Sequence, residues 1–117
     1  MSPLTELVTE FELNVRAQAD AIARGDSKSG NKYAKKYIEA FEELRRHGDA
    51  GRAALLPLLS HYRSEVRVMS AAYLLRYRTE DAKAVLEREA SGKGLTAFAA
   101  GQALRRWEEG SWSLDPV

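Results

Sequence analysis

Few side chains in this sequence are of the types that perform acid–base or metal chemistry. The chain has two histidines, His47 and His61, and no cysteine. Catalysis or metal binding would require these histidines to converge with carboxylates such as Asp49 or Glu65. Each histidine instead falls near the end of an expected helix, where the helix dipole favours an imidazolium. We therefore expect no metal site and no cofactor.

Three serines lie close to His61 in the sequence and could suggest a hydrolase: Ser60, Ser64 and Ser70. No Gly-x-Ser-x-Gly elbow surrounds any of them. Ser64 is better explained as a helix N-cap, and Ser70 as a small packing residue. The sequence thus predicts that the protein is not an enzyme.

Arginine and aromatic residues recur at a fixed interval. The segment 43–47 (Glu-Leu-Arg-Arg-His) is echoed by 73–77 (Tyr-Leu-Leu-Arg-Tyr) and by 103–107 (Ala-Leu-Arg-Arg-Trp). Short helical units that repeat in this way usually stack, so that equivalent positions share one side. Arginine and aromatic residues are enriched at protein interfaces. We expect another protein to bind a ridge formed by Arg46, Arg76, Tyr77, Arg106 and Trp107.

A basic segment offers an alternative function. Four lysines fall in the region of the second helix: Lys28, Lys32, Lys35 and Lys36. Tyr33 and Tyr37 accompany them. Basic side chains beside aromatic rings at a helix start can hold a phosphate or a single strand, although lysines on the wet face of a helix are also ordinary. Nucleic-acid or phosphate binding through this region is the second hypothesis.

Apolar residues recur every three or four positions throughout the chain, which predicts six helices and no strand. We expect helices over 2–24, 32–47, 65–77, 80–90 and 95–109, with a third helix from residue 49 that Pro57 kinks or ends early. Residues 25–31 read as a loop. The fold class is all-α, with one domain over 1–110 and a C-terminal tail over 111–117.

Local signals refine these helices. Ser2, Asp49, Ser64 and Thr79 are the expected N-caps. The expected apolar stripes of the first two helices include Ile22 and Ile38, and Phe98, Leu104 and Trp107 are expected to anchor the last helix. Gly101 costs helix propensity, and we expect close packing to offset that cost.

The stretch from Ala53 to Leu75 resembles one HEAT-type repeat. It has an apolar first helix with a proline, a turn, and then Val66-Arg67 followed by small residues and leucine. The resemblance implies a right-handed α-α superhelix, a HEAT-like stack of about six helices. It also implies that Arg67 pairs with a carboxylate or with carbonyls of a neighbouring helix.

Nearly the whole chain also resembles a small bacterial family of uncharacterised HEAT-like proteins. The resembling residues are Leu4-Thr5-Glu6-Leu7-Val8 at the start and Trp107-Glu108-Glu109-Gly110-Ser111-Trp112 at the end. That family has no assigned activity, so the resemblance bears on the fold.

Composition limits the remaining classes. The 117 residues are 44% hydrophobic and 30% charged with a net charge of +1, which suits a folded, water-soluble domain and argues against a generally basic surface. No segment approaches the roughly 20 apolar residues of a membrane span. We expect a cytoplasmic monomer or homodimer whose partner is another protein.

Overall fold

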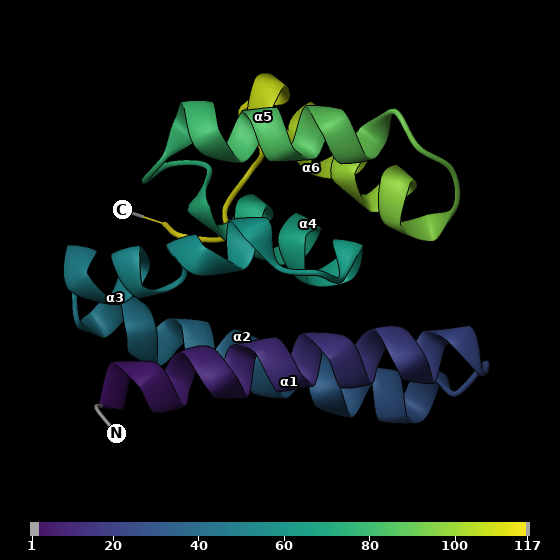
Figure 1. Ribbon diagram of the computed structural model, residues 1–117, viewed down its shortest axis with the longest axis horizontal. Helices are drawn as coiled ribbons and strands as arrows, with labels where there is room; N and C mark the ends of the chain where they lie inside the picture. The colour runs from purple at the N-terminus through teal and green to yellow at the C-terminus, as the bar shows by residue number, and fades with distance from the viewer. Residues whose placement is uncertain (1–2, 117) are drawn as a thin grey trace. The chain divides into compact units, whose positions relative to one another are not determined.

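Every regular element of the described residues, 3–116, is helical in the computed structural model. The elements are α1 (Pro3–Ala23), α2 (Ser27–Arg46), α3 (Asp49–Ala54), the 3-10 helix η1 (Leu56–Ser60), α4 (Ser64–Leu74), α5 (Thr79–Ala90) and α6 (Leu95–Glu109) (Figure 1). This confirms the all-α class. α6 has the predicted bounds, and α3 gives way to η1 around Pro57, as expected.

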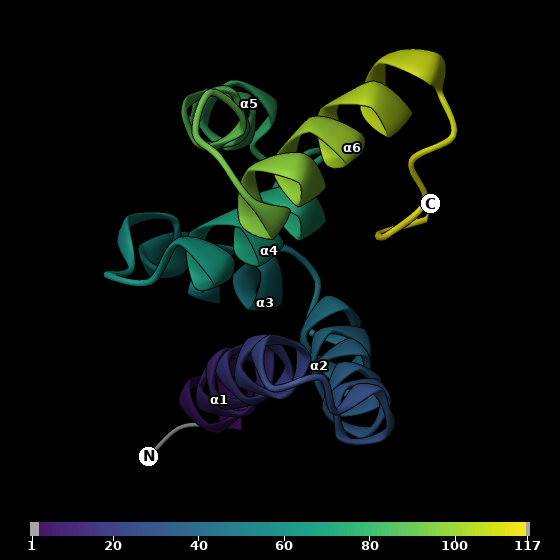
Figure 2. The same ribbon diagram turned by 90° about the vertical axis from the view of Figure 1, so that its right-hand side faces the viewer.

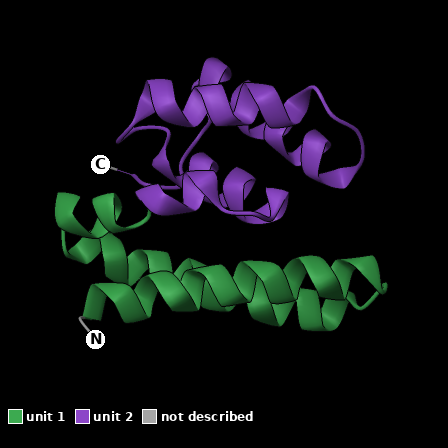
Figure 3. Cartoon of the chain, in the orientation of Figure 1, with its two compact units in different colours: residues 1–55 green, residues 56–117 purple. Residues whose placement is uncertain are grey.

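The chain divides into two compact units, residues 1–55 and 56–117 (Figure 3). The first unit holds α1, α2 and α3, and the second holds η1 and the helices α4, α5 and α6. A single domain over 1–110 stays a prediction.

The first unit is built on a hairpin of two long antiparallel helices, α1 and α2, which lie side by side (Figure 1). Phe11 and Val15 of α1 and Phe41 and Leu44 of α2 are almost completely buried. The Phe11 ring also meets Tyr37 edge-on, with 5.8 Å between ring centroids. The expected stripes were too wide, because Ile22 and Ile38 are each 45% exposed.

α2 begins earlier than the sequence suggested. Residues 25–31 were expected to form a loop, but the helix starts at Ser27 because the Asp26 carboxylate caps it, accepting a hydrogen bond from the Ser29 N–H at 3.0 Å. Hydrogen bonds from the backbone and the side chain of Ser29 hold the pKa of Asp26 below its usual range. Gly30, which lies within the expected loop, is buried inside α2 against Ala21 and Ile22.

α3 approaches the end of α2 closely. Its N-cap is Gly48, whose backbone lies in the left-handed region at φ 66°. One turn later Gly51 is buried so tightly that an added Cβ would collide with the carbonyl oxygen of Leu44. Only a residue without a Cβ allows this crossing.

In the second unit, α4 packs against η1, α5 and α6, and α5 packs against α6. Val66, Leu74 and Leu75 around α4 and Leu86 of α5 are fully buried. Figure 2 shows α5 nearly end-on, with α6 alongside it. α4 is therefore the central helix of this unit.

Arg67 confirms the role that the HEAT-type resemblance implied. Its Nε donates to a Glu89 carboxylate oxygen at 2.9 Å, and its terminal nitrogen donates to the His61 carbonyl at 2.8 Å. The first bond joins α4 to α5, and the second closes the turn before α4. A guanidinium suits this task because its donors are fixed in one plane.

The expected side-chain caps at three helix starts are wrong. Asp49, Ser64 and Thr79 are each the first helical residue, and the cap positions before them make no side-chain cap bond. Thr79 Oγ1 instead donates to the Leu75 carbonyl at 2.6 Å. Ser2, the fourth expected cap, lies outside the described residues.

Two expectations for α6 are also wrong. Phe98 is 64% exposed rather than an anchor, and the buried face consists of Ala97 and Ala100 with partial burial of Leu104 and Trp107. Nothing lies within 4 Å of a Cβ built on Gly101, so close packing does not explain that glycine.

Alanine at Gly51 of α3 and at Gly101 of α6 should have opposite effects. Gly51→Ala forces a methyl group against the Leu44 carbonyl and should lower the free energy of unfolding by about 2 kcal/mol. Gly101→Ala meets no neighbour and should raise it by about 0.5–1 kcal/mol through helix propensity. Urea denaturation followed by circular dichroism measures both, and an unchanged Gly51→Ala would contradict the close crossing.

Candidate functional site

The C-terminal tail, residues 111–116, folds back onto the end of α4. Gly110 ends α6 in the left-handed conformation, and the chain then reverses direction (Figure 2). Arg76, just after α4, donates from Nε to the Asp115 carbonyl at 2.9 Å and pairs with the Asp115 carboxylate at 3.2 Å. Because Asp115 is 1% exposed, this guanidinium balances a buried charge.

Trp112 provides the second anchor of the tail. Its indole Nε1 donates to the Ala72 carbonyl at 2.8 Å. That carbonyl lies in the last turn of α4, where no further helical N–H follows to bond it. The Trp112 ring also meets Trp107 of α6 edge-on, at 5.3 Å between centroids and 81° between planes. The tail thus links the ends of α4 and α6.

The anchored tail forms one wall of a pocket of about 420 Å³, which we call the tail pocket. Its lining residues are Arg76, Trp107, Gly110, Trp112, Ser113, Asp115 and Pro116. Two indole rings and a proline make much of this lining apolar, while the Arg76–Asp115 pair supplies its charge. Such a pocket suits an apolar side chain or a small ligand.

The tail pocket brings together two of the five residues predicted to bind a protein, Arg76 and Trp107. Tyr77, next to Arg76, is half-buried and has the Arg78 guanidinium 5.7 Å from its ring centroid. Arg106 is exposed on α6. Arg46 belongs to the first unit, where it pairs with Glu43. No common ridge of all five residues follows from these positions.

Sequence reasoning missed the tail residues that complete the pocket, Ser113, Asp115 and Pro116. The available signal was a pair of large apolar residues, Trp112 and Leu114, in an otherwise polar tail. Their presence indicates docking, but the partner of Asp115 is 39 positions away in the sequence, and only the fold brings it near.

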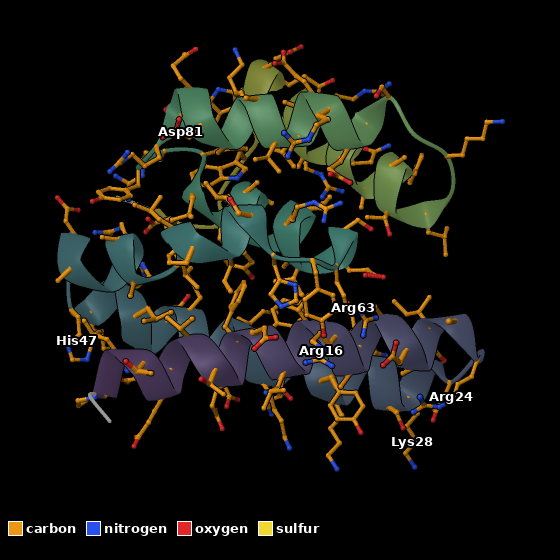
Figure 4. The ribbon with its side chains drawn as sticks, viewed as in Figure 1. Arg16, Arg24, Lys28, His47, Arg63 and Asp81 are labelled. Carbon is orange, nitrogen blue, oxygen red and sulfur yellow. The ribbon has the colours of Figure 1, made fainter. Side chains whose placement is uncertain are left out.

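The four lysines of the alternative site, Lys28, Lys32, Lys35 and Lys36, are all exposed on α2. Their spacing of three and four residues puts them on one side of the helix. Figure 4 shows Lys28 near Arg24 at one end of the first unit. Tyr37, however, is buried, and the Asp26 carboxylate already occupies the start of α2. Both features argue against an anion-binding site at the start of α2.

A second pocket, of about 360 Å³, lies in the first unit and contains His47. Its other lining residues are Pro3, Glu6, Leu7, Glu10 and Glu43. Figure 4 shows His47 near the start of α1, at the end of the unit away from Lys28. Within residues 3–116 no three carboxylates, histidines or cysteines are grouped so that they could hold a metal ion.

His61 belongs to the second unit and has a local role. Its Nδ1 accepts the Arg63 N–H at 3.0 Å, and its ring stacks on Tyr62 at 4.4 Å. In the described part of the chain, no helix has the length and hydropathy needed to cross a membrane.

Comparison with known proteins identifies a family and a solved structure but no activity. Residues 5–108 match DUF2019, a domain of unknown function. The crystal structure of the protein RPA1889 from Rhodopseudomonas palustris CGA009 is similar with a TM-score of 0.88 and 25% sequence identity, over 97% of this chain and 94% of that one. No curated protein matches.

The Arg76–Asp115 pair should control how tightly the tail is held. Arg76→Met removes both bonds to Asp115 and should lower the free energy of unfolding by about 1–2 kcal/mol. Trp112 should then become more exposed and its fluorescence should shift to the red. The control is Arg88→Met. Arg88 is an exposed arginine of α5, and its nearest carboxylate partner, that of Glu89, lies 3.9 Å away. Equal spectra and stabilities for the two variants would show that the tail does not depend on Arg76.

Proposed function

We propose that this chain, which belongs to the DUF2019 family, is a non-enzymatic module that binds another protein at the tail pocket. The observation that carries the proposal is the meeting of Arg76 and Trp107, two residues selected from the sequence as interface residues, with Trp112 around one pocket. Arginine and tryptophan are the residue types most enriched among binding hot spots.

The size and fixation of the pocket support this proposal. At about 420 Å³ it is large enough for an aromatic or branched aliphatic side chain of a partner. Its walls are already held by the Trp112–Ala72 bond and the Arg76–Asp115 pair. A partner would therefore not have to order the tail on binding, which reduces the entropic cost of association.

We further propose that the helices form a right-handed HEAT-like stack and that the protein acts in the cytoplasm. The stack is supported by the Val66-Arg67 pair and by the Arg67 bonds to Glu89 and His61, which suit stacked helical repeats. Cytoplasmic residence agrees with a chain that is 30% charged and has no cysteine to form disulfides. Stacked repeats commonly use one face for binding.

Site-specific cross-linking in the native cell tests the function. Ser113→p-benzoylphenylalanine puts a photoreactive ring at an exposed position of the tail pocket and should cross-link to a protein. The same substitution at Glu87, exposed on α5 and outside the pocket lining, is the control.

Adding Trp107→Ala to the Ser113 variant should reduce the cross-linked product at least about tenfold, as expected for loss of a hot-spot tryptophan. Cross-linking that is absent at Ser113, or equally strong at Glu87, would reject the tail pocket as the binding site.

Nucleic-acid or phosphate binding is the second candidate, because none of the four α2 lysines has an ion-pair partner within residues 3–116.

If the four α2 lysines bind phosphates, the protein should be retained on a heparin column at low salt. Changing all four lysines to glutamine should abolish retention, since each lost phosphate contact reduces the salt dependence of binding. Arg24→Gln, at the same end of the first unit, is the control. Flow-through of the unchanged protein at low salt would eliminate this candidate.

A further inference from the structure

Among the described residues, most arginines form ion pairs with carboxylates, but two arginines of α6 do not. Of the twelve arginines, ten form an ion pair with a carboxylate: Arg16, Arg24, Arg45, Arg46, Arg52, Arg63, Arg67, Arg76, Arg78 and Arg88. Arg105 and Arg106 of α6 have no such partner among residues 3–116, and both are exposed. The two neighbouring guanidinium groups therefore keep their charge unbalanced within the described chain.

The same side of α6 carries two exposed large apolar side chains. Leu95 is 72% exposed and Phe98 is 64% exposed. The spacing of Leu95, Phe98, Gln102, Arg105 and Arg106 in steps of three and four residues puts them on one side of the helix. We call these five residues the outer face of α6.

The burial pattern agrees with this assignment. Ala97 and Ala100, which belong to the opposite side of α6, are 8% and 0% exposed. α6 therefore packs through small residues toward α4 and α5, while Leu95 and Phe98 point away from its own unit's core. Exposed apolar residues that share a helix face with polar and charged residues are a feature of interaction surfaces.

We propose that the outer face of α6 binds an acidic amphipathic helix of another protein, with its apolar side chains on Leu95 and Phe98 and its carboxylates on Arg105 and Arg106. This inference rests on the proposed protein-binding function and adds a second surface with a defined partner chemistry. The apolar and basic ends of the face are about 16 Å apart. That distance is three turns of a partner helix.

Charge favours this occupant over a second copy of the chain. The stretch of α6 that would meet its own copy has two unpaired arginines and one glutamate on the same side, Glu109. A parallel pair of copies would bring the arginines together, and an antiparallel pair would place them on Leu95 and Phe98, so neither arrangement supplies them with carboxylates. Nucleic acid would satisfy the arginines but has no aliphatic side chain to cover Leu95. An acidic amphipathic helix satisfies both halves of the face.

Two synthetic helical peptides of about 18 residues, long enough to form helix in isolation, provide the probe. Both have leucines on one side and two charged residues about three turns away, glutamate in one peptide and lysine in the other. Binding to the full chain is measured by shifts of backbone amide signals in NMR. The glutamate peptide should perturb the outer face of α6 and bind about tenfold more tightly than the lysine peptide.

Charge reversal sharpens the test. In Arg105→Glu/Arg106→Glu the preference should invert, so that the lysine peptide binds more tightly. Phe98→Ser should weaken both peptides, whereas Arg78→Glu, at a paired arginine outside α6, should change neither. Because Phe98 and both arginines are exposed, these variants should retain the helical circular dichroism of the unchanged protein.

Three results would overturn the proposal: equal affinity for the two peptides, no shift at the outer face up to about 1 mM peptide, or shifts there that depend on protein concentration alone. The last result would indicate a second copy as the occupant. Failure of the peptides while Ser113 still cross-links to a protein would reject the outer face and leave the tail pocket intact.

Discussion

The guanidinium of Arg67 joins α4 to α5 and to the turn before α4. It leaves α4 and bonds both Glu89 of α5 and the carbonyl of His61. Its side chain is 23% exposed and that of Glu89 is 13% exposed, so solvent screens the pair only partly. A lysine has one nitrogen and could not maintain both bonds in the same plane.

The tail pocket depends on where α4 and α6 lie within this unit. Arg76 and the Ala72 carbonyl belong to the end of α4, whereas Trp107 belongs to α6, which follows α5. α4 packs directly against α6 as well as through α5, so both contacts place Trp107 beside the tail that Arg76 holds. Arg67 contributes to this arrangement by joining α4 to α5.

Much of the fold could be predicted from the sequence because helical periodicity is a local property. It gave the number of helices, the bounds of α6 and the effect of Pro57. The start of α2 was missed because Gly30 reads as a breaker in the sequence. In the structure Asp26 caps the helix, and the glycine packs against Ala21 and Ile22 of the preceding helix. Local propensity was overridden by packing.

The site was less predictable. Repeat spacing selected Arg76 and Trp107, which share a pocket, but it also selected Arg46, which lies in the other unit. Asp115 gave no sequence signal, because its importance comes from burial beside Arg76. Phe98 was expected to be buried because periodicity shows which residues share a side of a helix. Periodicity does not show which side faces the core, and α6 buries the side that carries Ala97 and Ala100. Because the alanine side is buried, Leu95 and Phe98 are left exposed on the outer face of α6.

The position of the two tryptophans has a consequence for how folding cooperativity can be observed. Trp107 and Trp112 are the only tryptophans in the chain, and both belong to residues 56–117. Indole emission therefore follows the melting of one unit, whereas the helical circular dichroism signal follows both. Coincident thermal transitions would mean that the halves of the molecule unfold as one cooperative system, and separated transitions would mean that each half has its own melting point.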